Sequence, residues 1–382
     1  ERRTLFLGAL TASFARGGGL LHPDVVAACR EDAARFRRWL AWRPRLEDAP
    51  PPDLSPVSGG AGTAPAGEMA GGDDGGGPRV FALSPRALRA AKTRLSAGDK
   101  PLQPALEQLI RDAEAALLIK PASVVEKTAT PPSGDKHDYM SLAPYWWPNP
   151  DKPDGLPYIR RDGEVNPELK NFPDREVLTR IASGAETLAL AHYFTGREGF
   201  AEHAATLLRT WFLDAATRMN PNLNYAQAVK GRNDGRGIGI IDTMSLIHAV
   251  DAAGLLAGTQ AWTEKDESGL RAWFSEFTEW LQSSRHGKNE AGTTNNHGTW
   301  YDAQLAAYAL FCGKDKIALQ TLQAAKAKRI DVQIRADGSM PEELGRTRSW
   351  DYSVMNLHGF FTLIALGERA GVELAGHQSK AG

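Results

Sequence analysis

DREVLTRIASGAETLALAHYFTGREGFAEHAATLLRTWFL, residues 174–213, is the stretch that decides the fold class. It holds two sets of apolar side chains at helical spacing, one through Val177, Ile181, Ala185 and Leu188, the other through Phe200, Ala204, Leu207, Leu208 and Trp211. This spacing is typical of amphipathic helices that bury one face. The short link Thr195-Gly196-Arg197-Glu198 joins the two sets and predicts an antiparallel helix pair.

The same helical spacing recurs on both sides of this pair. Ser84 and Pro85 form a typical helix start, and a second short turn lies at Cys312-Gly313-Lys314-Asp315. Further apolar stripes occupy residues 106–117, 270–281 and 357–364. Because strand-like alternation is nearly absent, we predict an all-α domain over residues 81–382. Its antiparallel helix pairs either stack as an open solenoid or curl into an α/α toroid, an incomplete barrel.

Residues 1–80 differ from this domain in composition. Residues 1–14 combine a charged end, a short apolar run and small residues, the layout of an export signal; a short buried helix is the alternative. Residues 24–46 contain an arginine-rich amphipathic pattern, and residues 50–78 have the Pro, Gly, Ala and Asp content of a disordered linker. We therefore expect a periplasmic or secreted protein.

Composition and charge exclude several classes of protein. The 382 residues are 42% hydrophobic, which is sufficient for a large core. The 45 basic and 46 acidic residues give a net charge of -1, so no nucleic-acid partner is expected. No uninterrupted apolar run approaches the ~20 residues that span a bilayer. The two cysteines and the lack of H-E-x-x-H or paired Cys/His spacing indicate neither a metal site nor a cofactor. The oligomeric state stays open.

The segment HDYMSLAPYWWP, residues 137–148, is rich in aromatic side chains and has no helical or strand periodicity. Prolines restrict its backbone, and aromatic faces stack on the C–H surfaces of sugars. We predict that this segment contacts a glycan through Tyr139, Tyr145, Trp146 and Trp147. The alternative is a loop that its tryptophans pin to the core.

The glycine-dense segment GRNDGRGIG, residues 231–239, carries two arginines four positions apart. It lacks the lysine and the preceding strand of a phosphate-binding loop. Because guanidinium groups bind carboxylates in a bidentate manner, we predict that Arg232, Asn233 and Arg236 contact a carboxylated substrate. Helix capping alone would also explain the glycines.

The segment TTNNHGTW, residues 293–300, places two amides and an imidazole at a predicted helix start. Asn296 can hydrogen-bond a carboxylate, and His297 can remove a proton near neutral pH. Trp300 adds an aromatic surface for the substrate. A helix N-cap with an incidental histidine is the alternative.

The segment ELGRTRSWDY, residues 343–352, also lies at a predicted helix start. Tyrosine is a poor base unless positive charge lowers its pKa, and either Arg346 or Arg348 can supply that charge to Tyr352. Arg348 is in addition a candidate contact for the substrate.

Four segments together resemble the alginate lyase superfamily of uronate-polymer lyases, polysaccharide lyase families five and thirty-eight. They are HDYMSLAPYWWPNPDKPDGLPYIRRDGEVNPE, GRNDGRGIGIIDT, NNHGTW and ELGRTRSWDY, spread over residues 100–371. The resemblance implies an α/α toroid with a deep cleft that cleaves uronic-acid chains by β-elimination without a metal. It implies that the loop at residues 145–147 is a lid over the cleft.

The resemblance also implies roles for single residues. The family's asparagine and histidine fall on Asn296 and His297, its arginine on Arg346 and its tyrosine on Tyr352. Family-five enzymes place the arginine one residue further from the tyrosine, so Arg348 stays an alternative. Residues 15–80 match nothing in the family pattern. Similar proteins continue into closing helices after Gly371, so the sequence predicts a truncated C-terminus.

The predicted function is a polysaccharide lyase that acts on an anionic uronate polymer, either alginate (polymannuronate) or glucuronan. In β-elimination, Asn296 and Arg346 would stabilise the charge that develops on the carboxylate, and Tyr352 would protonate the leaving oxygen. Tyr352 is also the base when the proton and the leaving group share a face of the sugar. His297 is otherwise the base, or else a donor that neutralises the carboxylate, according to the configuration at C5. One alternative is a glycoside hydrolase that uses Glu342 or Glu343 with Asp302 or Asp351. The other is a helical glycan-binding protein without catalysis.

Overall fold

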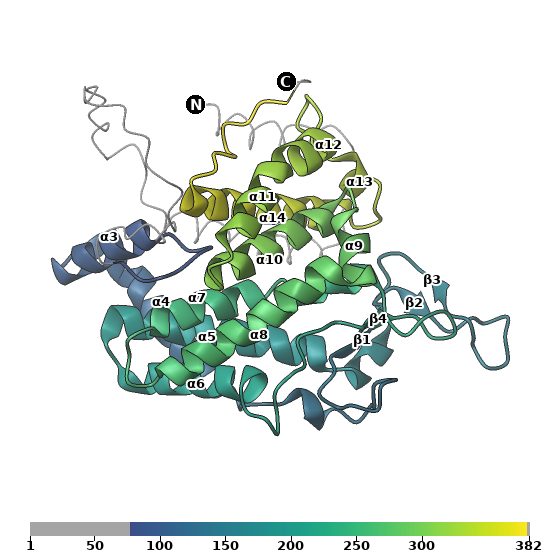
Figure 1. The fold of residues 1–382 in the computed structure, drawn as a ribbon, viewed down its shortest axis with the longest axis horizontal. Coiled ribbons are helices and arrows are strands. Elements are labelled where there is room, and N and C mark those ends of the chain that lie inside the picture. The colour runs from purple at the N-terminus through teal and green to yellow at the C-terminus, as the bar shows by residue number, and fades with distance from the viewer. Residues whose placement is uncertain (1–76, 380–382) are drawn as a thin grey trace.

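The structure is a computed structural model that describes residues 77–379. The predicted export signal, the amphipathic pattern at residues 24–46 and nearly all of the predicted linker lie outside the described residues. The described part is predominantly helical, as predicted (Figure 1). Its long helices are α3 (Pro85–Ser96), α4 (Gln103–Ala116), α5 (Asp174–Thr195), α6 (Glu198–Phe212), α7 (Leu246–Leu256), α8 (Glu264–Ser283), α10 (Asn296–Phe311), α11 (Asp315–Ala325) and α14 (Ser349–Ala370).

Local sequence signals set several of the helix ends. Ser84 caps α3 by accepting from the backbone N–H of Ala87, and Pro85 takes the first helical position. Thr263 and Asp266 form a reciprocal capping box at the start of α8. Gly196 ends α5 at a φ of 70°, a left-handed conformation that glycine adopts without a steric penalty.

The long helices form two layers. In the inner layer α5 packs on α7, α7 on α10 and α10 on α14 (Figure 1). Outside them, α4 and α6 pack on α5, while α8 and α11 pack on α10. This is the arrangement of an α/α toroid built from successive helix pairs.

The inner side of the helices encloses a cavity of about 2020 Å³. Most of its lining comes from α4, α5 and α14, with contributions from α3 and α7 and with Trp300 from α10. Leu106 and Leu109 belong to the predicted apolar stripe of α4, but they line this cavity and are only partly buried. The toroid is therefore an incomplete barrel.

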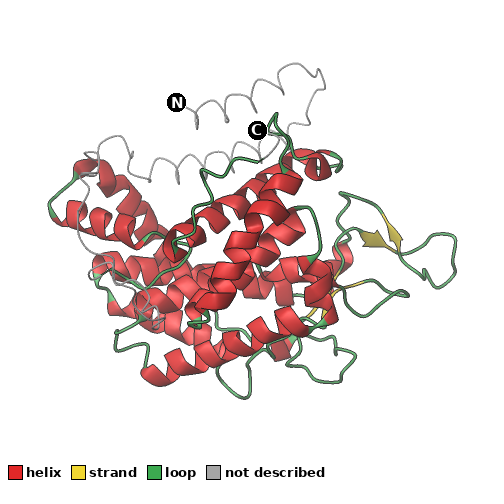
Figure 2. Ribbon diagram, turned by 45° about the horizontal axis from the view of Figure 1, so that its top comes forward, coloured by secondary structure: helices red, strands yellow, loops and turns green. Residues whose placement is uncertain are grey.

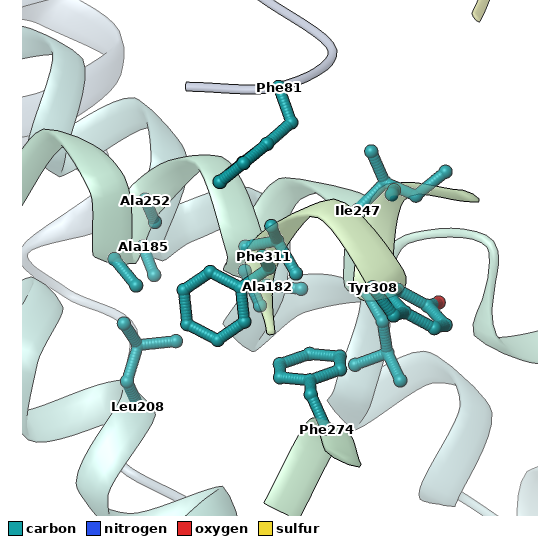
Figure 3. Close-up of a cluster of buried hydrophobic side chains, with 14 of the residues drawn as sticks. Phe81, Ala182, Ala185, Leu208, Ile247, Ala252, Phe274, Tyr308 and Phe311 are labelled. Carbon is teal, nitrogen blue, oxygen red and sulfur yellow. The ribbon is translucent and has the colours of Figure 1, made fainter. Parts of the chain in front are cut away.

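The hydrophobic core lies between the two layers. Phe274 of α8 contacts Tyr308 and Phe311 of α10 at ring-centre distances of 4.9 Å and 5.6 Å (Figure 3). Phe81 packs edge-on against Phe311 from the segment before α3. Buried Asp251 of α7 accepts from the backbone N–H groups of residues 81–83, which fixes that segment to the core.

Helical turns, short helices and short strands lie in the connections between the long helices. They are the helical turns η2 (Lys100–Leu102), η3 (Val124–Glu126), η4 (Pro167–Asn171), η5 (Gly237–Thr243) and η6 (Lys326–Ile330), and the short helices α9 (Arg285–Ala291), α12 (Asp331–Gln333) and α13 (Pro341–Leu344). The strands are β1 (Met140–Leu142), β2 (Trp146–Trp147), β3 (Ile159–Arg160) and β4 (Tyr225–Ala228).

The four short strands form two separate two-stranded sheets. β1 pairs in parallel with β4 against the helices, whereas β2 and β3 form an antiparallel hairpin with Trp146 opposite Arg160. The hairpin and the loop that links its strands project from the helical body at one edge (Figures 1 and 2). Two of these strands, β1 and β2, lie in residues 137–148, a segment whose sequence shows no strand periodicity.

One segment among residues 77–379 is long and apolar enough to cross a membrane. It is Gly237–Leu256, with a hydropathy of 1.4, and it consists of η5 and α7. Because 83% of it is buried inside the protein, it is a core segment of the toroid.

Candidate active site

Polar side chains gather at the amino ends of the inner helices. α10 begins at Asn296, and Arg175 lies in the first turn of α5. Asp242 lies in η5, just before α7, with its Oδ1 3.6 Å from Nε of Arg175. The pKa of Arg175 is raised chiefly by Asp242 and in part by Tyr352 near the start of α14. Since helix amino ends carry partial positive charge, this end of the toroid favours an anionic ligand.

Arg346 and Tyr352 are in direct contact. Nη2 of Arg346 donates to the Tyr352 hydroxyl over 2.8 Å, and the guanidinium carbon lies 3.8 Å from the centre of the tyrosine ring. Tyr352 in turn donates to the hydroxyl of Tyr145 over 2.8 Å. Arg348 instead pairs with Asp351 at 2.5 Å and is exposed. The arginine beside Tyr352 is therefore Arg346.

The surroundings of Tyr352 favour its neutral form. Burial raises its pKa well above the usual value, and the hydrogen bond to Tyr145 adds to the shift. Arg346 lowers the pKa but does not reverse the shift. The sequence suggested that a neighbouring arginine lowers the pKa of this tyrosine, and this is wrong because the net shift is upward. Tyr352 keeps its proton at neutral pH and is equipped to donate it.

His297 is held by a buried carboxylate. Its Nδ1 lies 2.7 Å from Oε1 of Glu290, a residue with 0% exposure. A carboxylate only accepts hydrogen bonds, so Nδ1 carries a proton, and in the neutral ring the lone pair lies on Nε2. This arrangement orients a histidine to accept a proton at Nε2.

Asn296 is bound by a second buried carboxylate, Glu343 of α13. The backbone N–H and the side-chain Nδ2 of Asn296 both donate to Glu343, each over 2.7 Å. Asn296 is 0% exposed, and its Oδ1 has no hydrogen-bond partner within residues 77–379. One N–H of Nδ2 is thus engaged, and only the other is left for a substrate. The substrate contact of Asn296 stays a prediction.

Glu343 connects the two halves of the site. It precedes Arg346 by three residues and is bonded to Asn296. Burial raises the pKa of Glu343, while the hydrogen bonds from Asn296 and the charges of His297 and Arg346 lower it. The four predicted catalytic residues, Asn296, His297, Arg346 and Tyr352, therefore lie in one neighbourhood.

The aromatic loop and the glycine-dense segment meet at Trp146. The guanidinium carbons of Arg232 and Arg236 lie 5.0 Å and 5.9 Å from the centre of its ring. Arg236 also donates to both the backbone and the side-chain oxygen of Gln227 in β4. Burial lowers the pKa of Arg236 to about 10, so it stays charged at neutral pH. The structure thus joins two predicted binding segments.

The glycines of the glycine-dense segment permit close backbone packing. A Cβ atom on Gly235 would lie 2.0 Å from the carbonyl oxygen of Asn224, and one on Gly237 would lie 2.7 Å from that of His286. No side chain fits at either position. These two glycines therefore have a packing role, and helix capping does not explain them.

One predicted substrate contact is wrong. Tyr139 is 0% exposed, and its hydroxyl donates to Asp242 over 3.2 Å. Its side chain fills the protein interior, which an aromatic residue does as readily as it binds a sugar. Trp300 is 4% exposed and donates from Nε1 to the carbonyl of Met355, where α10 packs on α14. Because Trp300 also lines the large cavity, its substrate contact stays a prediction.

The remaining predicted contacts lie nearer the surface. Trp147 is half-buried, donates to the carbonyl of Glu164 and lies under Arg161 at 5.3 Å. Arg232 and Asn233 are exposed and line a separate pocket of about 350 Å³. Arg175 and Asp242 line the large central cavity, whereas the four predicted catalytic residues do not.

Four acidic or basic residues of the site carry no prediction from the sequence: Asp162, Arg175, Asp242 and Glu290. Asp162 accepts from Nε and Nη2 of Arg346 over 3.2 Å and 2.7 Å, although 184 residues separate the two. One sequence contains no signal for such a distant pair. The sequence contains only a weak indication that Glu290 belongs to the site, because it precedes His297 by seven residues in a polar segment.

Two of the four carboxylates proposed for the hydrolase alternative are hydrogen-bonded to other side chains, and the other two are exposed. Asp302 binds Nε and Nη2 of buried Arg329 over 2.7 Å and 3.1 Å, and Glu343 binds Asn296. Glu342 and Asp351 are exposed. In the described part of the chain, no group of three or more His, Cys, Asp or Glu side chains is placed to hold a metal ion.

Comparisons with known proteins identify relatives of the chain. A family model described as alginate lyase matches residues 123–382. The crystal structure of an alginate lyase from Bacteroides ovatus has 42% sequence identity and a TM-score of 0.76, with 80% of each chain covered. A histidine-to-alanine variant of alginate lyase A1-III, complexed with a tetrasaccharide, has 16% identity and a TM-score of 0.50, with 81% of this chain and 76% of that chain covered. No curated protein matches the chain.

These findings confirm the resemblance and the predicted fold. The family match covers more than half of the chain and includes the four predicted catalytic residues. The structure at 42% identity supports the α/α toroid, and the one at 16% identity is alike in fold alone. They also favour the lyase over the hydrolase and the binding protein. The chain belongs to the alginate lyase family and is a polysaccharide lyase.

Proposed function

We propose that this enzyme cleaves alginate by metal-independent β-elimination, with His297 as the base and Tyr352 as the acid. The observation that carries the proposal is the contact of the half-buried Tyr352 with a cation, because Nη2 of Arg346 donates to its hydroxyl over 2.8 Å. A protonated hydroxyl beside a cation can release its proton and leave a stabilised phenolate.

The reaction begins at the C5–H bond of the uronate. Nε2 of His297 takes the C5 proton, and the positive imidazolium is stabilised through Nδ1 by Glu290. The electron pair of the C5–H bond forms the C4=C5 double bond, and the C4–O bond breaks. The Tyr352 hydroxyl protonates the leaving oxygen. The products are an unsaturated uronate and a new chain end. Atoms and charge balance, and transfer of one proton from His297 to Tyr352 through solvent returns the enzyme to its starting state.

Positive groups support the choice of an anionic substrate. Removal of the C5 proton places negative charge on the adjacent carboxylate, and Arg346 is the nearest cation to the acid Tyr352. Arg175 and Arg236 add positive charge at the same end of the toroid. The partial positive charge at the helix amino ends also favours an anionic substrate.

Alginate is the proposed polymer because the solved relative at 42% identity is described as an alginate lyase. Glucuronan, the other uronate polymer expected from the sequence, stays the second candidate. When the C5 proton and the C4 oxygen lie on opposite faces of the sugar, a base and an acid on two side chains are required. Two different groups, His297 and Tyr352, meet that requirement.

The test is direct. The protein is incubated with mannuronate blocks, guluronate blocks and glucuronan, and the ultraviolet absorbance of the unsaturated uronate is followed. We expect absorbance to rise with at least one alginate block and not with cellulose, which lacks the carboxylate that acidifies the C5 proton. Cleavage of cellulose to ordinary reducing ends, or activity on glucuronan alone, would contradict the proposal.

A further inference from the structure

Asp162 lies in the loop that follows β3 and carries a dense set of hydrogen bonds. Its carboxylate accepts from Nε and Nη2 of Arg346, over 3.2 Å and 2.7 Å. It also accepts from the backbone N–H and the hydroxyl of Thr347, over 3.3 Å and 3.0 Å, and from Arg160 over 2.7 Å. No other carboxylate has a described contact with Arg346 within residues 77–379.

The loop is shaped to bring Asp162 to this position. The next residue, Gly163, has a φ of 82°, and a Cβ atom there would lie 2.5 Å from the Thr347 hydroxyl. A side chain at this position would thus be strained and would also push the loop away from Thr347. Glycine therefore permits the loop to touch the segment that contains Arg346.

The same hairpin touches the site at a second point, Tyr145. The backbone N–H of Arg161 donates to the carbonyl of Tyr145 over 2.8 Å, so the two contacts belong to one rigid unit. Tyr145 binds the hydroxyl of Tyr352, and Asp162 binds the guanidinium of Arg346. Both contacts of this hairpin with the α13–α14 region thus fall on, or directly beside, predicted catalytic residues.

The three nitrogen atoms of the Arg346 guanidinium do not share the same partners. A guanidinium is planar, so two hydrogen bonds from Nε and Nη2 to one carboxylate fix the orientation of the whole group. Nη2 also donates to Tyr352. The described contacts leave Nη1 for another acceptor, such as the carboxylate of a substrate. Arg346 holds the pKa of Asp162 far below its usual range, so the carboxylate is charged at neutral pH.

We propose that Asp162 is a positioning residue that acts through Arg346. Its carboxylate holds the guanidinium with Nη2 on Tyr352 and Nη1 free for the uronate carboxylate. It thereby couples the docking of the β2–β3 hairpin to the assembly of the catalytic site. This inference rests on the proposed function of Arg346 and Tyr352 in β-elimination.

The first test uses Asp162→Asn and Asp162→Ala with alginate blocks as substrate. We expect kcat to fall about 10- to 100-fold, because small displacements of a catalytic group have effects of this size, while KM changes less than about 3-fold. Asp162→Glu restores part of the activity. The matched control is Asp151→Asn, an exposed carboxylate in the loop between β2 and β3, and we expect its kcat to match the wild type.

The dependence of kcat on pH distinguishes a role of Asp162 in positioning Arg346 from an effect that only loosens the loop. Removal of the Asp162 charge leaves the charge of Arg346 less neutralised, which favours the phenolate of Tyr352. The basic limb of the kcat profile should therefore move to lower pH in Asp162→Asn. A variant that only loosens the loop, Thr347→Val, should leave that limb in place.

A double-variant comparison tests whether Asp162 acts through Arg346. In an Arg346→Ala background, measured at high enzyme concentration, Asp162→Ala should change kcat by less than about 2-fold. The inference is overturned if Asp162→Asn keeps kcat within 2-fold of the wild type, or if Asp162→Ala costs as much without Arg346 as with it.

One measurement is independent of turnover. In the wild type, the Nε–H proton of Arg346 should exchange slowly with solvent in an NMR spectrum, and in Asp162→Asn it should exchange rapidly. If the wild-type enzyme forms no unsaturated product, the proposed function fails, and this exchange measurement still decides whether Asp162 fixes Arg346. Equal exchange rates in the two proteins would reject the positioning role.

Discussion

The Nη2 atom of Arg346 donates a 2.8 Å hydrogen bond to the hydroxyl of Tyr352. In the free enzyme, burial outweighs this cation and raises the pKa of Tyr352, so the tyrosine starts the reaction with its proton. When the proton leaves, the same cation stabilises the phenolate. The pair is therefore suited to an acid that is neutral at rest and charged after proton transfer.

Tyr352→Phe removes the proton and keeps the ring. We expect kcat on alginate to fall by about 10²- to 10⁴-fold, the range of general acid catalysis, while KM changes little. Loss of the hydrogen bonds costs on the order of 1 kcal/mol of stability, which thermal unfolding can measure. The control is Tyr193→Phe on α5, whose ring packs on Phe194. Normal turnover by Tyr352→Phe would remove this residue from the mechanism.

Glu290→Gln tests the assignment of His297 as the base. The amide can still accept from Nδ1, but it no longer stabilises the imidazolium, so kcat should fall about 10- to 100-fold. KM should change little, since Glu290 is fully buried and does not reach a substrate. Glu276→Gln, an exposed carboxylate of α8, is the matched control. An unchanged kcat in Glu290→Gln would argue for Tyr352 as both base and acid.

The helical layers could be predicted from the sequence because most of the apolar side chains at helical spacing are buried between the layers. Phe274 and Phe277 lie in a predicted stripe of α8, and both are fully buried. The stripe of α4 was equally periodic, yet Leu109 faces the central cavity. Periodicity shows which face of a helix is apolar, and it does not show how completely a neighbour covers that face.

The residue pattern alone predicted contacts only where the partners are close in the chain, and it was the family resemblance that grouped Asn296 and His297 with Arg346 and Tyr352. Arg346 and Tyr352 are six residues apart, so a helix start can bring them together, and the structure has them in contact. Asp162 reaches Arg346 from 184 residues away, through a hairpin that the sequence presents as an irregular loop. Tyr139 was misassigned because its type and neighbours are those of an exposed glycan loop, while its side chain binds buried Asp242.

Arg346→Lys and Arg348→Lys distinguish the two arginines of the ELGRTRSWDY segment. Lysine keeps the charge but loses the planar set of donors that binds Asp162 and Tyr352 together. We expect kcat to fall about 10²- to 10³-fold for Arg346→Lys, the range for loss of one donor that stabilises developing charge. Arg348→Lys should stay within about 2-fold of the wild type, because Arg348 is exposed and pairs with Asp351. A larger loss in Arg348→Lys than in Arg346→Lys would reverse the assignment.

The last prediction concerns stability at alkaline pH. His248 of α7 lies with Nδ1 2.9 Å from Oε2 of Glu186 on α5, and this carboxylate raises the pKa of His248 to about 9, against the opposing effect of burial. In the unfolded chain the histidine pKa is about 6.5, so the folded protein binds one more proton than the unfolded chain between these values.

The contribution of this pair is therefore fully present below about pH 6.5 and is lost as the pH rises through about 9. Because 41% of the His248 side chain is exposed, solvent screening limits the contribution to about 1 kcal/mol or less. Urea unfolding at pH 6 and at pH 9.5 measures it as the difference between the wild type and Glu186→Gln. The wild type should be the more stable protein at pH 6 and should lose this advantage by pH 9.5, since neutral His248 gains nothing from the carboxylate. Asp251, whose pKa burial and Glu186 raise to about 7, is then also charged and repelled by Glu186, which acts in the same direction. A difference that is constant across this range would mean that His248 does not titrate with Glu186.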